Sequence, residues 1–311
     1  MIISASRRTD IPSYYSDWFF RRISEGYVLV RNPMNNRQVS RVKLSADTLD
    51  GIVLWTKNPL PMIGRLRELK VPFYFQFTLN SYAKDVEPHI PSKNDVIIPA
   101  FQKLSRLIGR ERVVWRYDPI LLNDTYTVGY HLKYFALLAR KLRDYTESCT
   151  FSFIDFYRNT RNNTKFLDLQ IPRLEDKLVI AEAFGRTARD YGLKINTCAE
   201  ELDLSHFGVG HATCVDGRLL ERIGGCKLNT ERDRNQRIDC GCAASIDIGM
   251  YDSCRSGCLY CYANRSLTAT ERHFHNHDPA SPLLYGRISA DDRVTERQVF
   301  SYRESQKELF G

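Results

Sequence analysis

Short apolar runs alternate with helical stretches from residue 51 to residue 196, and this alternation restricts the fold more than any other feature of the sequence. Each apolar run has the length and residue content of a strand, and the stretches between the runs are long enough for helices. Strands and helices that alternate in this way form βαβ units on a parallel sheet. The predicted strands are residues 52–56, 73–78, 113–117, 150–154 and 193–196, and the predicted helices are residues 62–69, 96–108, 128–142 and 174–191.

Two further apolar runs extend this pattern at its ends. Residues 1–6 read as a strand, and residues 245–251 read as a strand that leads into a cysteine-rich loop. A helix that has Ser16 as its N-cap follows the first strand, and residues 28–30 and 39–42 form a hairpin. About seven strands in the sheet predict an α/β fold, a full or partial (β/α) TIM-type barrel, with a cysteine-rich C-terminal segment.

Polar residues follow directly after six of the predicted strands. At any single strand this is expected, because loops meet water. Six such loops together, with charges immediately after apolar strands, predict one shared edge of the sheet, where barrel enzymes carry their active sites. The cysteine loop should open on the same edge. The six loops are residues 7–10, 56–59, 78–80, 116–119, 155–158 and 196–198.

The composition predicts a soluble, metal-binding protein of the cytoplasm. The 311 residues contain no run of about 18 apolar residues, which a membrane span needs, and residues 1–8 lack the order of a signal peptide. Eight of the nine cysteines lie between Cys198 and Cys261, and such clustering indicates metal rather than disulfides. The net charge of +8 attracts phosphate groups, but the basic residues are spread along the chain and give only weak evidence for nucleic acid.

Three cysteines follow the last predicted strand with the spacing C-x3-C-x2-C. Each can bind one iron of a four-iron cluster, and since protein-only ligation uses four cysteines, the fourth iron stays open. A structural zinc site is the alternative, because zinc takes four nitrogen or sulfur ligands. The spacing leaves both metals open. The three cysteines are Cys254, Cys258 and Cys261, and a fourth zinc ligand would come from His273, His275 or His277.

The cysteine spacing, with the aromatic Tyr260 before the last cysteine, resembles the signature of the radical S-adenosylmethionine (radical SAM) superfamily. In that superfamily the open iron binds the amino and carboxylate groups of SAM. Nearly the whole chain also resembles a bacterial family, domain of unknown function 1848, whose C-terminal cysteine cluster is like that of radical SAM enzymes. The segments that carry this resemblance are residues 4–12, 55–59, 75–78, 87–88, 115–119 and 247–264.

A more distant likeness is to the spore photoproduct lyase-like radical SAM proteins. It rests on Thr9-Asp10, on residues 56–59, and on Thr78 followed by Glu87-Pro88, which occur in the same order as in those proteins. The cysteine loop comes last here, although it comes first in those proteins. The chain therefore resembles a circularly permuted radical SAM barrel, and such a permutation is physically reasonable because a barrel brings its ends together.

The resemblance implies a role for each matched residue. Cys254, Cys258 and Cys261 would bind the catalytic [4Fe-4S] cluster, and Tyr260 would pack near the adenine of SAM. No residue is assigned to catalysis itself, and an electron donor such as flavodoxin or ferredoxin is the implied partner. The methionine part of SAM would contact Arg7, Arg8, Thr9 and Asp10, the ribose would contact Thr78 and Asn80, and SAM or the substrate would contact Arg116 and Asp118.

Five cysteines remain in the same region. Four thiolates suffice for a second [4Fe-4S] cluster, zinc suits four sulfurs equally well, and buried cysteines without metal are the third interpretation. The four in segments that resemble the family are Cys198, Cys214, Cys240 and Cys242, and Cys226 is left over.

We therefore predict an enzyme that binds a [4Fe-4S] cluster and cleaves SAM reductively to abstract hydrogen from an unidentified substrate. Nucleic acid is one candidate substrate, by analogy alone. The alternative function is a non-catalytic zinc- or iron-sulfur-binding protein associated with nucleic acid. The expected units of one compact domain are residues 1–200 with the barrel, 201–244 with the auxiliary cysteines, and 245–311 with the cluster loop and tail. The sharpest structural prediction is that the N-terminal strand pairs beside residues 245–251.

Overall fold

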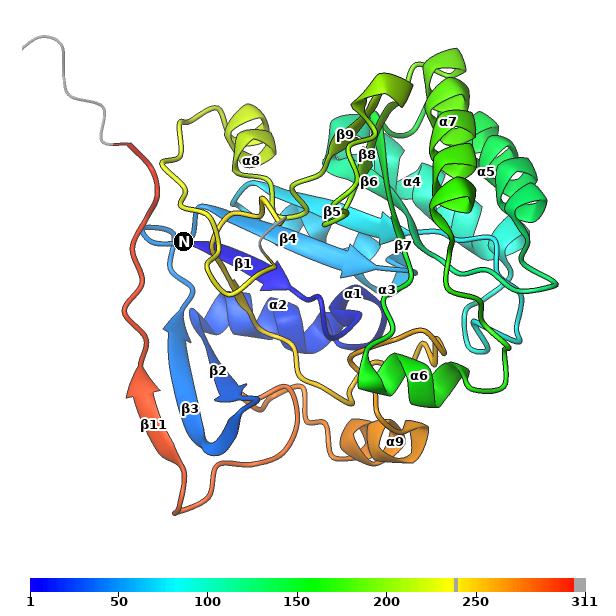
Figure 1. Cartoon of the computed structure of the whole chain (residues 1–311). Coiled ribbons are helices and arrows are strands. Elements are labelled where there is room, and N and C mark those ends of the chain that lie inside the picture. The colour runs from blue at the N-terminus through cyan, green and yellow to red at the C-terminus, as the bar shows by residue number, and fades with distance from the viewer. Residues whose placement is uncertain (238–239, 305–311) are drawn as a thin grey trace, which may run out of the picture.

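An eight-stranded parallel sheet forms the centre of the molecule (Figure 1). The computed structural model describes residues 1–237 and 240–304, and the strands of this sheet lie in the order β10-β1-β4-β5-β6-β7-β8-β9. From β1 to β9 the spatial order follows the chain without a reversal, unlike the order of a doubly wound sheet. The strands are β1 (Ile2–Ala5), β4 (Gly51–Thr56), β5 (Phe73–Thr78), β6 (Val113–Ile120), β7 (Ser148–Phe153), β8 (Lys194–Thr197), β9 (Val209–His211) and β10 (Ser245–Asp247).

Helices cover one face of this sheet (Figure 1). The four longest contribute buried apolar side chains to the same core as the strands: α2 (Ser16–Glu25), α4 (Ile98–Ile108), α5 (Val128–Leu142) and α7 (Leu174–Asp190). Within the described residues, no helix is both long enough and apolar enough to cross a membrane. The shorter helices are α1 (Ile11–Tyr14), α3 (Leu60–Ile63), η1 (Leu66–Glu68), η2 (Lys93–Ile97), η3 (Arg110–Arg112), α6 (Arg158–Thr164), η4 (Ser205–Phe207), α8 (Gly217–Gly224) and α9 (Leu267–His275).

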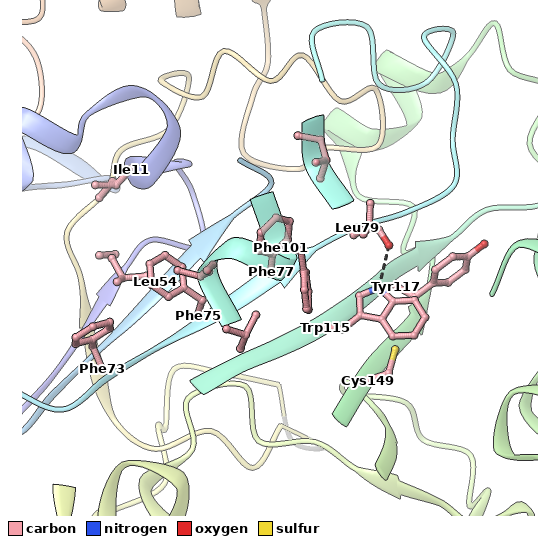
Figure 2. Packing of buried hydrophobic residues seen from close by; sticks show 14 of the residues in the cluster. Ile11, Leu54, Phe73, Phe75, Phe77, Leu79, Phe101, Trp115, Tyr117 and Cys149 are labelled. Carbon is pink, nitrogen blue, oxygen red and sulfur yellow. Dashed lines mark hydrogen bonds between the residues drawn. The ribbon is translucent and has the colours of Figure 1, made fainter. Parts of the chain in front are cut away.

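The core beneath the helices is rich in aromatic side chains (Figure 2). Alternate residues of each strand face it, because successive side chains of a strand point to opposite faces. Trp115 of β6 stacks on Phe135 of α5 with ring centroids 5.0 Å apart, and its indole nitrogen donates to Leu79 O at 3.0 Å (Figure 2). This packing fixes β6 against α5 and against the chain that leaves β5.

The opposite face of the sheet is covered by the segment around α8 instead of by the long helices. Val53 of β4 and Tyr74 of β5 share a buried cluster with Leu220 of α8 and with Cys214 and Cys242. Tyr74 Oη donates to Cys214 O at 2.8 Å, so the cysteine segment is bonded directly to the sheet. The auxiliary cysteines therefore lie on the face of the sheet that α8 covers, opposite the face covered by the long helices.

A second, smaller sheet has the order β11-β3-β2. The strands β2 (Tyr27–Asn32) and β3 (Asn35–Lys43) are antiparallel neighbours, which confirms the predicted hairpin. The strand β11 (Arg293–Glu296) pairs with β3 in parallel. Beyond β11 the chain returns to the N-terminus, where the amino group of Met1 donates to Phe300 O at 2.6 Å.

The structure confirms the predicted α/β class and the predicted neighbour of the N-terminal strand. β10 pairs with β1 in parallel, with Ile2 opposite Ser245 and Ser4 opposite Asp247. The strand predicted over 245–251 ends early, because the backbone N–H of Gly249 bonds to the Asp247 carboxylate instead of to a neighbouring strand. Residues 305–311, the end of the predicted unit 245–311, lie outside the described residues.

Three predicted elements need correction. The single helix over 62–69 is two short helices, α3 and η1, with Gly64 between them. Ser16 is the first residue of α2, and Tyr15 occupies the N-cap position, where its side chain makes no capping hydrogen bond to the helix. Within the described residues the large sheet has eight strands instead of the predicted seven or so. The strand that was missed is β9, which has only three residues, one of them glycine, and therefore shows no periodic pattern.

Candidate functional site

The cysteine loop begins where β10 ends and is bonded to the loop that follows β1. The carboxylate of Asp247 accepts hydrogen bonds from Ser6 Oγ (2.6 Å), from the backbone N–H of Arg7 (2.8 Å) and from the guanidinium of Arg8 (3.0 Å). At position 249 only glycine fits, because a Cβ would lie 2.1 Å from Ser6 Oγ. The predicted contact between these two loops is confirmed.

Replacing Asp247 by asparagine is expected to destabilise the fold by about 2 kcal/mol. An amide nitrogen then takes the place of one carboxylate oxygen, and this nitrogen cannot accept these hydrogen bonds. Urea unfolding followed by far-UV circular dichroism measures the change. Asp291→Asn is the matched control, because Asp291 is exposed and surface substitutions stay within about 0.5 kcal/mol. Equal unfolding midpoints for the two variants would show that Asp247 does not hold the loops together.

Thr9 and Tyr15 add further bonds to the cysteine loop. The hydroxyl of Thr9 lies 2.6 Å from Ser253 Oγ and accepts from the backbone N–H of Met250 at 3.1 Å. Tyr15 Oη donates to Ser253 O at 2.7 Å. The residue before Cys254 is thus fixed by two elements from the N-terminal part of the chain.

The three thiols of the loop lie near one another. The charge of Cys261 raises the pKa of Cys254, and the charges of Cys254 and Cys261 raise the pKa of Cys258, but within the described residues no hydrogen bond joins any two of the three thiols. Burial is the main cause of these shifts, and it raises the pKa of Cys254 to about 11. The loop is closed by two bonds, Cys261 N to Cys258 O at 3.0 Å and Asn264 Nδ2 to Cys254 O at 2.5 Å. Three neighbouring sulfurs, of which Cys258 is buried and Cys254 and Cys261 are partly buried, can each bind a different metal atom.

A buried ion network stands beside Cys258. Glu87 lies between two lysines, with 2.7 Å to Lys57 Nζ and 2.6 Å to Lys93 Nζ. Burial alone would raise the pKa of Glu87, but the two ammonium groups lower it to about 2. Burial lowers the pKa of Lys57, but the charges of Glu87 and Cys258 raise it by more, so the pKa lies above its ordinary value. The network places one net positive charge next to the three thiols.

Tyr260 connects this network to the loops after β5 and β6. Its hydroxyl donates to Glu87 and accepts from Asn80 Nδ2 at 3.1 Å. Asn80 in turn bonds Asp118, accepting from its backbone N–H at 2.7 Å and donating to its carbonyl at 2.9 Å. Lys57 lies over the Tyr260 ring, 5.4 Å from its centroid. The ring of Tyr260 is therefore held in a fixed position beside Cys258.

The four auxiliary cysteines predicted to act together lie close to one another. Cys198 Sγ lies 3.2 Å from Cys214 Sγ, and Cys242 lies near both Cys214 and Cys240. The bond from Cys214 is the main cause that lowers the pKa of Cys198 to about 7. The same kind of bond, from Cys214 and Cys240, lowers the pKa of Cys242. All nine cysteines of the chain are free thiols.

Two arginines face this group of thiols. Arg116 Nη1 donates to Cys214 Sγ at 2.9 Å, and its Nη2 forms an ion pair with Asp118 at 2.9 Å. Arg7 hydrogen-bonds to Cys242. Both guanidinium groups lie over the ring of Trp55, at 5.3 Å for Arg7 and 5.2 Å for Arg116. Positive charge therefore stands on two sides of the auxiliary cysteines.

Among residues 1–237 and 240–304, no group of three or more His, Cys, Asp or Glu side chains is arranged so that it could hold a metal ion without rearrangement. The histidines considered as zinc ligands bond to backbone carbonyls, His273 to Asp252 O and His275 to Glu271 O at 2.7 Å each, and His277 to Leu284 O at 2.6 Å. Two surface pockets have volumes of about 540 and 660 Å³, and no cysteine is among the residues that line them.

Most of the predicted site residues lie either with the cysteine triplet or with the auxiliary cysteines. Thr9, Asn80 and Tyr260 lie with the cysteine triplet, and Asp10 is buried at the N-cap of α1, where its carboxylate accepts from Lys57 N at 2.7 Å. Arg8 is paired with Asp247, and Thr78 is half-buried at the end of β5. The residues that lie with the auxiliary cysteines are Arg7, Arg116 and Asp118.

Sequence reasoning assigned no role to Lys57, Glu87 or Lys93. Lys57 follows an apolar strand directly, and that position was a usable signal. Glu87 and Lys93 lie in the long connection between β5 and α4, where no periodic pattern indicates which side chains turn inward. Their approach to Cys258 is visible only in the folded chain.

Comparison with known proteins places the chain in a family. No curated protein matches it. The family model described as "Domain of unknown function (DUF1848)" matches residues 2–263, a stretch that runs from β1 to the end of the cysteine triplet. This match covers most of the 311 residues. The chain belongs to the domain of unknown function 1848 family.

Proposed function

We propose that this protein is a radical SAM enzyme with a circularly permuted, partial (β/α) barrel. The observation that carries the proposal is the triplet of separate buried thiols at the carboxyl end of β10, beside the loop that follows β1. The unreversed order of parallel strands from β1 to β9 supports the barrel. When bound, the cluster and SAM supply one-electron cleavage of the sulfonium to methionine and a 5′-deoxyadenosyl radical, which abstracts hydrogen from a substrate.

The residues of the triplet fit a four-iron cluster with one open iron. Such a cluster binds each thiolate through a different iron, so its ligands surround the cage without touching. Cys254, Cys258 and Cys261 meet this requirement, because they are neighbours without mutual hydrogen bonds. The buried charge of Lys57 beside Cys258 also favours the thiolate form that metal binding needs.

The neighbouring residues orient and enclose this site. Thr9 and Asp247 hold the cysteine loop at a fixed place on the sheet. Tyr260, held by Glu87 and Asn80, presents a rigid ring next to Cys258 on which an adenine can pack. Asp10 holds the backbone of Lys57, so we assign it a positioning role. No residue of the chain is assigned to proton or hydrogen transfer.

The test is anaerobic reconstitution followed by incubation with SAM and dithionite. We expect brown protein with about four irons at the triplet that bleaches on reduction and yields 5′-deoxyadenosine. Chromatography with mass detection measures that product. A fully reconstituted sample that forms no 5′-deoxyadenosine would contradict the proposal.

The same experiment separates the alternative function, a non-catalytic zinc- or iron-sulfur-binding protein associated with nucleic acid. That function predicts either colourless protein or a coloured protein that never consumes SAM. A nucleic acid substrate is kept as a proposal and would appear as a product that depends on added DNA or RNA. We place the enzyme in the cytoplasm, where free thiols persist, with a flavodoxin or ferredoxin as electron donor.

A further inference from the structure

The auxiliary cysteines come from both edges of the large sheet. Cys198 follows β8 directly and Cys214 follows β9, which is one edge strand. Cys240 and Cys242 lie just before β10, which is the other edge strand. Three loops at opposite edges of the sheet thus bring four thiols to one place, on the face of the sheet that α8 covers.

The spacing of these sulfurs distinguishes a single ion from a cluster. In a tetrahedral zinc site with bonds of about 2.3 Å, neighbouring sulfurs lie about 3.8 Å apart. The 3.2 Å between Cys198 and Cys214 must widen by only about 0.6 Å to reach that geometry. Ligands of a four-iron cluster bind different irons, so their sulfurs lie farther apart than those of a single zinc ion. Among the auxiliary thiols, Cys198 and Cys214 are in contact, and Cys242 is close enough to Cys214 and Cys240 for each of them to lower its pKa.

We propose that Cys198, Cys214, Cys240 and Cys242 bind one zinc ion that links the two edges of the sheet. Within the described residues, backbone pairing joins β9 only to β8 and β10 only to β1. The ion therefore connects two strands that the sheet itself leaves apart. This inference goes beyond the proposed function, because it requires no SAM and no iron.

The charges around the thiols suit such an ion. Zinc with four thiolates carries two negative charges, and burying them requires compensating positive groups. Arg116 supplies a positive charge in direct contact with Cys214, and Arg7 supplies a second one near Cys242, whose charge raises the pKa of the guanidinium. Arg7 Nη2 is buried and has no hydrogen-bond partner in the described part of the chain, so it can donate to a thiolate that the ion fixes in place.

Metal analysis of the native protein tests the site. We expect about one zinc per chain, and zinc-edge X-ray absorption should show four sulfurs at about 2.3 Å. Cys242→Ser should lose the zinc and keep its iron, whereas Cys258→Ala should lose iron and keep its zinc. Cys226→Ser is the matched control and should keep both. Zinc absent from the native protein, zinc bound by nitrogen or oxygen, or about eight irons without zinc would each overturn the proposal.

Hydrogen exchange tests the link between the edges without any substitution. Removal of zinc by a mercurial and a chelator should increase exchange of the backbone amides in β9 and β10 at least tenfold. The amides of β5 and β6, at the centre of the sheet, should keep their protection. Unchanged exchange in β9 and β10 after measured zinc loss would refute the structural link. A failure of the SAM assay with zinc still bound would affect the proposed function alone.

Discussion

Cys258→Ala is expected to reduce 5′-deoxyadenosine formation to background, a loss of more than about 100-fold, since even changes outside the ligand shell of metal sites cost 10–100-fold. Cys258 is the most deeply buried thiol of the triplet and the one beside the Lys57–Glu87 network. Without it, two thiolates remain, and they leave two irons of the cluster without protein ligands. The broad visible absorption of the reconstituted protein should disappear together with the activity.

The sheet should survive this substitution, because alanine is small and the loop is held independently by Asp247, Thr9 and Asn264. Far-UV circular dichroism and the zinc content therefore serve as measures of folding. Cys226→Ala is the control, since Cys226 belongs to neither group of thiols. A Cys258→Ala protein that still forms 5′-deoxyadenosine at the native rate would remove the triplet from the proposed chemistry.

Most of the large sheet could be predicted because its strands are buried on both faces. Continuous apolar runs such as those of β4 and β5 are typical of parallel strands covered on both sides. The pairing of β1 with β10 was predictable from the order of motifs, although the two strands lie more than 240 residues apart. The strand β9 was not, because three residues with a glycine at the centre carry no periodic signal.

The grouping of the cysteines was also predictable, whereas the partners of the charged residues were not. Spacing and clustering separated Cys254, Cys258 and Cys261 from the auxiliary thiols. The direction of Arg116 depends on the alternation of side chains along β6: Trp115 and Tyr117 face the helices, and Arg116 faces the auxiliary cysteines. Arg7 lies in a loop after β1, where this alternation no longer applies, and its contact with Cys242 needed the structure.

Glu87→Gln is expected to destabilise the protein by about 3 kcal/mol at pH 7, because it leaves two buried ammonium groups without their shared carboxylate. The carboxylate of Glu87 bonds Lys57, Lys93 and Tyr260, so no other group can replace it. Urea unfolding at pH 7 measures this change. Glu182→Gln, an exposed position on α7, is the control and should shift stability by less than about 0.5 kcal/mol.

The pH dependence of that difference identifies its origin. The pKa of Glu87 is lowered from its ordinary value of 4.5 to about 2 in the folded protein, so the carboxylate contributes stability above pH 4.5 and loses it as the pH falls toward 2. A shift of this size corresponds to about 3 kcal/mol. Native protein and Glu87→Gln should therefore differ most at pH 7 and converge between pH 4.5 and 2, as unfolding at pH 7, 4 and 3 can measure. A difference that stays constant over this range would mean that Glu87 acts by packing and not by its charge. Convergence would show that Glu87 acts by its charge, which keeps Lys57 charged beside Cys258, where the ammonium group lowers the pKa of the thiol.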